Sequence, residues 1–328
     1  MPRQVEDYQY AERYIAQRLL TALVTMFLLT LVIFGITQVL PGDVARMIMG
    51  QYYDPLALAS LREQLGLNDP LHVQYLRWLT SALHADFGQS LVMKIPVGPL
   101  VFQAAGRSAL LAVPAVGLTA LVGISFGVIG AVKRETFVDY ITSIISFLGI
   151  SVPEFVTGML LIIVFSAHLH LLPSSGYVSP LHDPAGWLAH SIMPVATLVL
   201  AFMAHVARLT RSGMLEVLQS NFVRFARARG ISELAVMTNH TLPSALLPTI
   251  TVLALAIGAM IGDIVVVETV FSYPGLGQLL VRSIQRRDLP VIQACILIAS
   301  AAYIIANLVA DLLYAWLDPR ISYTGETG

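Results

Sequence analysis

The residues of this sequence that could carry out enzyme chemistry do not form a catalytic pattern. A loop that binds nucleotide phosphates needs a lysine followed by serine or threonine, and the only lysines, Lys94 and Lys133, are followed by Ile95 and Arg134. The serines of "PSSGY" are not set in a nucleophile elbow, and no histidine stands at helical spacing to activate them. The sequence therefore predicts no catalytic residues and no nucleotide hydrolysis by that route, and leaves an intramembrane serine protease as the enzymatic alternative.

The residues most similar to metal ligands are His168 and His170 in "AHLHLLP". Zinc sites are built from clusters of histidine, cysteine or acidic residues, whereas the single cysteine, Cys295, lies in an apolar run and has no partner for an internal disulfide. Histidines near the end of an apolar run commonly place their polar tips at a membrane interface. We therefore expect no metal site and no cofactor on this chain.

A basic segment, "NFVRFARARGISELAVMTNHTLP" at residues 221–243, is more informative. Together with two upstream residues it forms a basic cluster: Arg208, Arg211, Arg224, Arg227 and Arg229. Ser220 or Asn221 is placed to cap a first helix, Gly230 is placed to end it, and Ser232 is placed to cap a second.

The first of these helices is predicted to be amphipathic, with Phe222, Phe225 and Ala226 on one face and Arg224, Arg227 and Arg229 projecting from it. Such a helix–glycine–helix hairpin is suited to a groove on another protein. The alternative is a solvated basic loop that simply follows the excess of lysine and arginine in cytoplasmic loops.

The composition places these residues in a membrane protein. Of 328 residues, 56% are hydrophobic and only 12% are charged, whereas about a quarter of the residues in soluble domains are charged. The net charge of −1 gives no general attraction to nucleic acid.

Charge-free runs long enough for the hydrocarbon core, which needs about 20 residues, predict six transmembrane helices. They lie between Arg18 and Asp43, between Arg107 and Lys133, at about 152–169, between Asp183 and Arg208, between Glu233 and Asp263, and at 289–310. Pro153 is expected to kink or restart the third.

The distribution of lysine and arginine predicts that both termini are cytoplasmic, because short loops on that side then carry most of these residues. Residues 208–243 become the longest cytoplasmic loop. Residues 41–107 become a large outer loop, in which Pro, Asn and Gly breaks predict short helices. That loop either packs as a lid or offers a docking surface.

The cytoplasmic segment resembles the EAA loop of ABC-importer permeases, whose pattern is Glu-Ala-Ala, three residues, Gly, nine residues and Ile-x-Leu-Pro. The positions that match this pattern are Arg224, Phe225 and Ala226, then Gly230, then His240, Leu242 and Pro243. An arginine in place of the glutamate is similar to the peptide/nickel branch of the family, although "TLPSALLP" departs from that branch.

The resemblance extends along the whole chain. The blocks that carry it are "LGLNDPLHVQYLRWL", "ADFGQS", "SFLGISVPEF", "VVVETVFSYPGLGQLLVRSIQRRDLPVIQA" and "DLLYAWLDPRI". They are similar to the first permease subunit of dipeptide, oligopeptide, glutathione or nickel importers. The resemblance implies an all-α, type I ABC-importer permease fold, as one permease domain over residues 1–328, in the bacterial inner membrane.

The resemblance also implies partners: a second, different permease subunit, two cytoplasmic ATPase subunits that bind ATP, and an extracytoplasmic substrate-binding protein, besides membrane lipid and without nucleic acid. The residues that it assigns to ATPase docking are Arg224, Ala226, Arg227, Gly230, His240 and Pro243. Di- or oligopeptides are the first expectation for the substrate, with nickel chelates, glutathione and opines as alternatives. From another class, an ion-coupled secondary transporter is the alternative.

Asp263 departs from the family pattern, in which small residues are usual at this place. A carboxylate within a span is costly and faces the protein interior or a watery cavity. It either pairs with an arginine or hydroxyl of the second permease subunit, or forms an anionic point on the substrate path that favours cationic groups. The nearby Glu268 needs only a packing role.

Overall fold

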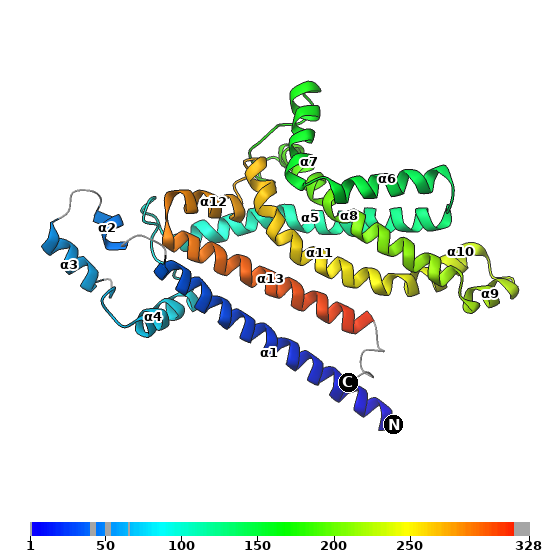
Figure 1. Ribbon diagram of the computed structural model, residues 1–328, viewed down its shortest axis with the longest axis horizontal. Coiled ribbons are helices and arrows are strands. Elements are labelled where there is room, and N and C mark those ends of the chain that lie inside the picture. Colours follow the sequence, from blue (N-terminus) through cyan, green and yellow to red (C-terminus); the bar gives the residue numbers. More distant parts are fainter. Residues whose placement is uncertain (1, 40–43, 50–53, 65, 318–328) are drawn as a thin grey trace. The chain divides into compact units, whose positions relative to one another are not determined.

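The chain folds into helices. In the computed structural model (Figure 1), the described residues are 2–39, 44–49, 54–64 and 66–317. Their packing divides the chain into two compact units: unit 1 comprises residues 1–20, 109–273 and 305–328, and unit 2 comprises residues 21–108 and 274–304. Within the described residues, β structure is limited to one isolated bridge, between Gln89 and Pro96. The assignment of residues 1–328 to one permease domain stays a prediction.

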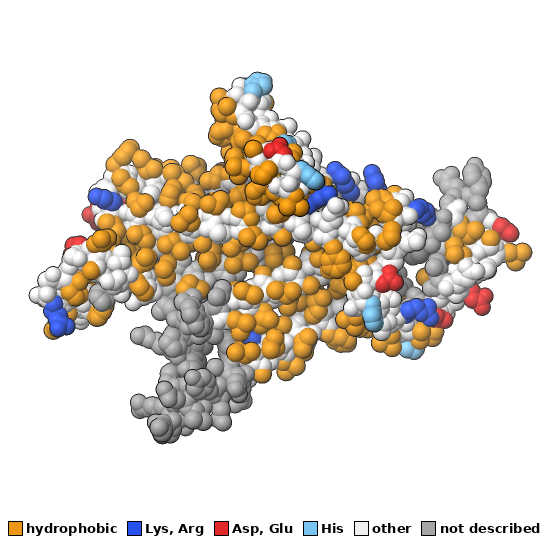
Figure 2. All heavy atoms as spheres, turned by 180° about the vertical axis from the view of Figure 1, so that it is seen from behind, with side chains coloured by type: hydrophobic (Ala, Val, Ile, Leu, Met, Phe, Trp, Pro, Cys, Tyr) orange, Lys and Arg blue, Asp and Glu red, His pale blue; other side chains and the backbone are white. Residues whose placement is uncertain are grey.

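Five helices of the described chain are long and apolar enough to cross a membrane. They are α1 (Pro2–Val39), α5 (Val97–Val132), α8 (Pro184–Leu218), α11 (Leu242–Val270) and α13 (Leu289–Leu317). Hydrophobic side chains cover most of the described surface that Figure 2 shows, and charged side chains are sparse there. These helices confirm the membrane class and coincide with five of the six predicted crossings.

The third predicted crossing is a bent pair of helices. Its parts are α6 (Phe137–Ser151), α7 (Glu154–Leu161) and the π-helix η1 (Ile162–His168), which continues α7. The two arms meet at 110°, and only together are they long and apolar enough for a span. The break lies at Pro153, because a proline drives the preceding residue to extended angles and Val152 has φ −100° and ψ 121°. The crossing predicted at 152–169 thus contained only the second arm.

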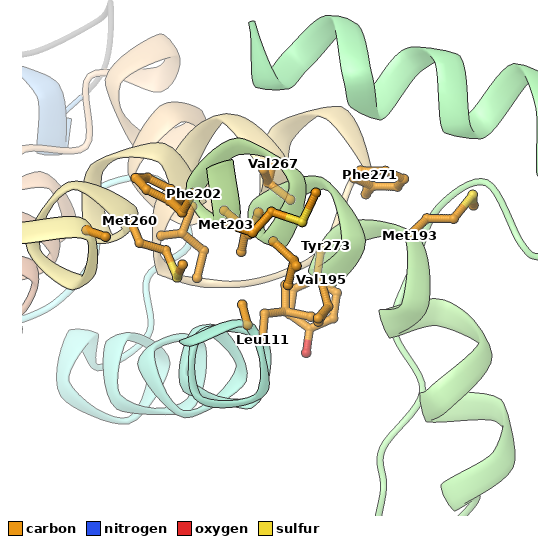
Figure 3. Close-up of a cluster of buried hydrophobic side chains, with 14 residues drawn as sticks. Leu111, Met193, Val195, Phe202, Met203, Met260, Val267, Phe271 and Tyr273 are labelled. Atoms are coloured by element: carbon orange, nitrogen blue, oxygen red, sulfur yellow. The ribbon is translucent and has the colours of Figure 1, made fainter. Parts of the chain in front are cut away.

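The core of unit 1 is arranged around α8. Phe202 of α8 is buried in one cluster with Met260 of α11 and Leu111 of α5 (Figure 3). The helices α5 and α8 approach closely because α5 carries glycine at the contact: a Cβ on Gly127 would lie only 2.6 Å from the carbonyl oxygen of Ala207. Small residues let the backbones of membrane helices pack in this way.

Unit 2 contains the short helices predicted between the first two spans. These are α2 (Val44–Met49), α3 (Pro55–Gln64) and α4 (Leu71–Leu83), and unit 2 also contains α12 (Leu276–Arg286). Tyr75 of α4 makes a 2.8 Å hydrogen bond with Thr30 of α1 and packs edge-on against the ring of Phe34. The short helices therefore confirm the prediction, and α4 is tied to α1 by specific contacts.

The boundaries of α5 and α8 differ from the span boundaries that were predicted at the charged residues Arg107 and Arg208. The helix α5 begins at Val97, so Arg107 lies within the helix instead of ending the outer loop at 107. Its guanidinium is accommodated because Nη1 donates a hydrogen bond to the carbonyl oxygen of Pro274 at 3.4 Å. Likewise α8 continues past Arg208 to Leu218. Residues 40–43 of the outer loop and the end of "DLLYAWLDPRI" lie outside the described residues.

Candidate functional site

The basic segment between α8 and α11 forms a helical hairpin. Its elements are α9 (Asn221–Ala228), α10 (Glu233–Ala235) and the π-helix η2 (Val236–Thr241). The Ser220 hydroxyl caps α9 by accepting a hydrogen bond from the amide of Val223 at 3.4 Å, and Ser232 caps α10 by accepting one from Ala235 at 3.4 Å. Of the two predicted caps for the first helix, Ser220 is the one used, and the cap at Ser232 is confirmed.

Gly230 ends α9 in the left-handed region, with φ +75°. Its amide donates to the carbonyl oxygen of Arg227 at 2.9 Å, and the amide of Ile231 donates to that of Ala226 at 3.3 Å. These two bonds form a Schellman motif, which satisfies the last helix carbonyls and favours glycine. A Cβ on Gly230 would meet no heavy atom of the described chain within 4 Å. The glycine is therefore required by its backbone angle and not by crowding within the chain.

The inner face of the hairpin differs from the predicted one. Val223, Ala226 and Val236 are buried together, whereas Phe222 is 58% exposed and Phe225 is 74% exposed. The apolar side of α9 is therefore buried only at Val223 and Ala226, and its two phenylalanines are exposed. Valine and alanine pack inward at this place, and the phenylalanines form an apolar outer surface next to arginines.

The arginines of α9 have two different environments. Arg227 donates hydrogen bonds from Nε and Nη2 to the carboxylate oxygens of Glu233, at 2.8 and 3.1 Å, and so joins α9 to α10. Arg224 and Arg229 are exposed, and no ion pair joins them to another residue of the described chain. The hairpin thus presents two unpaired cations beside Phe222 and Phe225.

Arg211 is part of an internal ion pair and not of the exposed basic surface. Its Nε and Nη2 donate to the two carboxylate oxygens of Asp139, at 2.8 Å each. Asp139 is only 6% exposed and also accepts the amide of Glu135 at 3.1 Å. Gly130 of α5 leaves room for the pair, because a Cβ there would lie 3.2 Å from Cδ of Arg211. This pair connects α6 to α8. Arg211 precedes the first residue of the hairpin helix α9 by ten positions in the sequence.

Sequence reasoning missed this pair. The signal that was present is a carboxylate inside the otherwise apolar segment "FVDYITSIISF", because such a group needs a cation or several donors when it is buried. Arg208, the other upstream arginine, is exposed and lines a pocket of about 300 Å³ between α5, α6 and α8.

The remaining predicted docking residues lie where the hairpin joins α11. Pro243 is in the first turn of α11, which follows η2 directly. His240 lies within η2, and its side chain is outside the described part of the chain. The structure thus brings Arg224, Ala226 and Arg227 together on α9.

Asp263 lies within α11 and is partly buried. The arm α7, which begins at Glu154, packs against α11. No hydrogen bond or ion pair joins Asp263 to another described residue. Glu268, in contrast, is fully buried.

Comparison with known proteins decides the family. Residues 123–323 match the family described as binding-protein-dependent transport system inner membrane component. The chain belongs to this family. Residues 11–97 match the N-terminal membrane component of such transport systems. The first match includes the hairpin, the bent pair of α6 and α7, and the long helices α8, α11 and α13. The candidate site therefore lies in the part of this permease that the family model matches.

The permease is similar over nearly its whole length to curated proteins. It is 39% identical to the probable peptide ABC transporter permease protein y4tP of Sinorhizobium fredii, over 310 residues that cover 94% of this chain and 99% of that protein. It is 40% identical, with the same coverage, to the glutathione transport system permease protein GsiC of Salmonella paratyphi A and of Escherichia coli. A crystal structure of an amino acid ABC transporter has a TM-score of 0.48 and 18% identity, and covers 68% of this chain and 94% of that one.

These findings confirm the family that the sequence motifs indicated. The chain is a multi-pass inner-membrane permease subunit of an ABC importer, with the type I permease fold.

Proposed function

We propose that this permease forms half of the pathway by which an ATP-driven importer takes up di- or oligopeptides. The names of the similar proteins support a peptide-like cargo, because one is a probable peptide permease and the others are glutathione permeases, and glutathione is itself a peptide. Nickel chelates and opines are the other cargoes of the same importer type. The family match favours an importer over an ion-coupled secondary transporter.

The observation that carries the proposal is the two-sided hairpin between α8 and α11. Its inner side is fixed by the buried Val223 and Val236 and by the Schellman motif at Gly230. Its outer side presents Phe222, Phe225 and two arginines, Arg224 and Arg229, that form no ion pair with another described residue. Exposed aromatic residues beside arginine are typical of the centres of protein–protein interfaces. A cytoplasmic ATPase subunit is the partner that we assign to this surface.

In the proposed assembly, this chain pairs with a second permease subunit, two ATPase subunits bind ATP, and an extracytoplasmic binding protein delivers the cargo. Closure of the ATPase pair moves the docked hairpin, and the hairpin moves α8 and α11, to which it is joined covalently at both ends. The bidentate Asp139–Arg211 pair then passes the movement to α6. The path between the spans thereby opens to one side of the membrane or to the other.

Reconstitution of the complete importer in liposomes tests this proposal. We expect uptake of dialanine that requires ATP and loaded binding protein, and no uptake by this chain alone. The variant Phe225→Ala should weaken binding of the ATPase subunits, whereas Phe271→Ala, which alters the buried core of unit 1, should act on stability. Uptake by this chain alone, driven by an ion gradient, would contradict the proposal.

Asp263 is proposed as an anionic point on the substrate path. A partly buried carboxylate with no hydrogen-bond or ion-pair partner among the described residues favours a cationic group, and the amino terminus of a peptide supplies one. The alternative role for Asp263 is an ion pair or hydrogen bond with the second permease subunit.

A further inference from the structure

A second charged region lies in unit 2, away from the hairpin in the sequence. The helix α12 and the first turns of α5 enclose a pocket of about 230 Å³. Three arginines line it: Arg107 of α5 and Arg282 and Arg286 of α12. The proposed function, as argued from the hairpin, uses none of them.

The one acidic residue among those that line this pocket does not neutralise the arginines. Asp288 is 1% exposed, and its carboxylate accepts hydrogen bonds from the hydroxyl of Ser90 and from the amides of Leu91 and Val92, the last two at 3.0 and 3.4 Å. Its oxygens are therefore directed to the segment before α5. Arg282 and Arg286 therefore carry positive charge that this carboxylate does not offset.

Two of the arginines are placed as like charges on one helix face. Arg282 and Arg286 are four residues apart on α12, a spacing at which equal charges repel and destabilise a helix. Both are exposed, and neither forms an ion pair or hydrogen bond with another residue that the structure describes. An anion bound between them removes this repulsion, and the planar guanidinium fork suits a carboxylate oxygen pair.

The rest of the lining restricts the size and character of the ligand. Pockets for whole drug-sized molecules usually hold about 300–1,000 Å³, so this pocket accepts one end of a peptide and not its full length. Leu100, Leu279 and Met93 supply apolar wall beside the arginines, and the buried Gln278 adds an amide. A terminal residue with its carboxylate has this combination of an apolar part and an anionic part.

We propose that the pocket between α5 and α12 binds the carboxylate of the transported peptide-like substrate through Arg282 and Arg286, an inference that rests on the proposed function for the nature of the cargo. The same oxyanion chemistry is offered by the phosphate of an anionic phospholipid. The experiment therefore separates these two sources.

The test uses the full-length chain in lipid nanodiscs, with saturation-transfer NMR titrations of dialanine and of dialanine amide, which lacks the carboxylate. We expect dialanine to bind at least about tenfold more tightly than the amide, because hydrogen bonds to charged groups are strong. The double variant Arg282→Gln/Arg286→Gln should lose this preference. Both side chains are exposed, so the thermal unfolding midpoint of the variant should stay within a few degrees of the wild type.

Arg287→Asn provides the matched control. Arg287 follows Arg286 directly but does not line the pocket, and its φ of +57° suits asparagine. This variant should bind dialanine like the wild type. Equal affinity of the wild type for dialanine and for its amide would overturn the proposal. The same result would follow if Arg287→Asn lost the preference for dialanine as completely as the double variant does.

Two disc compositions distinguish the sources of the anion. In discs of phosphatidylcholine alone and in discs with added phosphatidylglycerol, the preference for dialanine should be the same. Loss of dialanine binding on adding phosphatidylglycerol, only in proteins that keep both arginines, would assign the pocket to lipid and overturn its role in substrate binding. ATP-driven uptake by the assembled importer is measured separately. Absence of that uptake alongside intact dialanine binding would refute the proposed function and not the pocket.

Discussion

Substitution of Gly230 separates the folding of the hairpin from its docking. A non-glycine residue at φ +75° adds strain of about 1–2 kcal/mol, and no clash is added within the described chain because a Cβ there would meet no heavy atom within 4 Å. The strain falls on a short surface hairpin and leaves the buried core of unit 1 unchanged. Gly230→Glu should therefore insert at wild-type abundance, but its side chain projects into the surface that we assign to the ATPase subunit.

The expected result is loss of most ATP-driven uptake by the Gly230→Glu importer, with ATP hydrolysis no longer stimulated by loaded binding protein. Gly88→Glu is the matched control, because Gly88 has φ +73° and equally open surroundings but lies in unit 2. This variant should keep ATP-driven uptake. Gly230→Asn, which tolerates the left-handed region, should keep most uptake. Wild-type uptake by Gly230→Glu at equal membrane abundance would refute the docking role of this residue.

Three further predictions concern the ion pair, the intramembrane carboxylate and the division of labour between subunits. Asp139→Asn should lower the thermal stability of the detergent-solubilised chain by roughly 2 kcal/mol, less than for a fully buried pair because about a third of the Arg211 side chain is exposed; a cost below about 0.5 kcal/mol would contradict this. Asp263→Asn should reduce uptake of peptides with a cationic amino terminus and spare acetylated ones, whereas equal loss with dissociation of the permease pair would assign Asp263 to assembly. The chain expressed alone should hydrolyse no ATP above background, and hydrolysis by the pure chain would contradict the assignment of ATPase activity to partners.

The long helices could be predicted because each is an uninterrupted apolar run whose minimum length is set by the thickness of the hydrocarbon core. The ends of helices were less accurate when charge alone defined them. Arg107 is accommodated inside α5 because the carbonyl oxygen of Pro274, 167 residues away in the sequence, accepts its hydrogen bond. The residues around Arg107 do not indicate this partner.

The hairpin was predictable in outline because Gly230 and Ser232 act through the backbone of their own neighbours. The side of α9 that is buried could not be predicted in the same way. Phe222, Phe225 and Ala226 fit one amphipathic pattern, but Val223 and Ala226 are the residues buried against Val236, and both phenylalanines are exposed. The Asp139–Arg211 pair likewise depends on the packing of two helices whose residues are 72 positions apart.

The bend at Pro153 determines on which face of the membrane every later segment lies. Each crossing reverses the side of the chain, and neither arm of the pair reaches across alone, because 15 residues of α6 extend only about 22 Å. When the pair counts as one crossing, the hairpin after α8 lies on the same side as the N-terminus, which the distribution of lysine and arginine predicts to be the cytoplasmic side. Deletion of residues 137–168 would change the count from even to odd and turn α8 over. The hairpin would then lie on the side of the membrane opposite the N-terminus, with its own sequence unaltered.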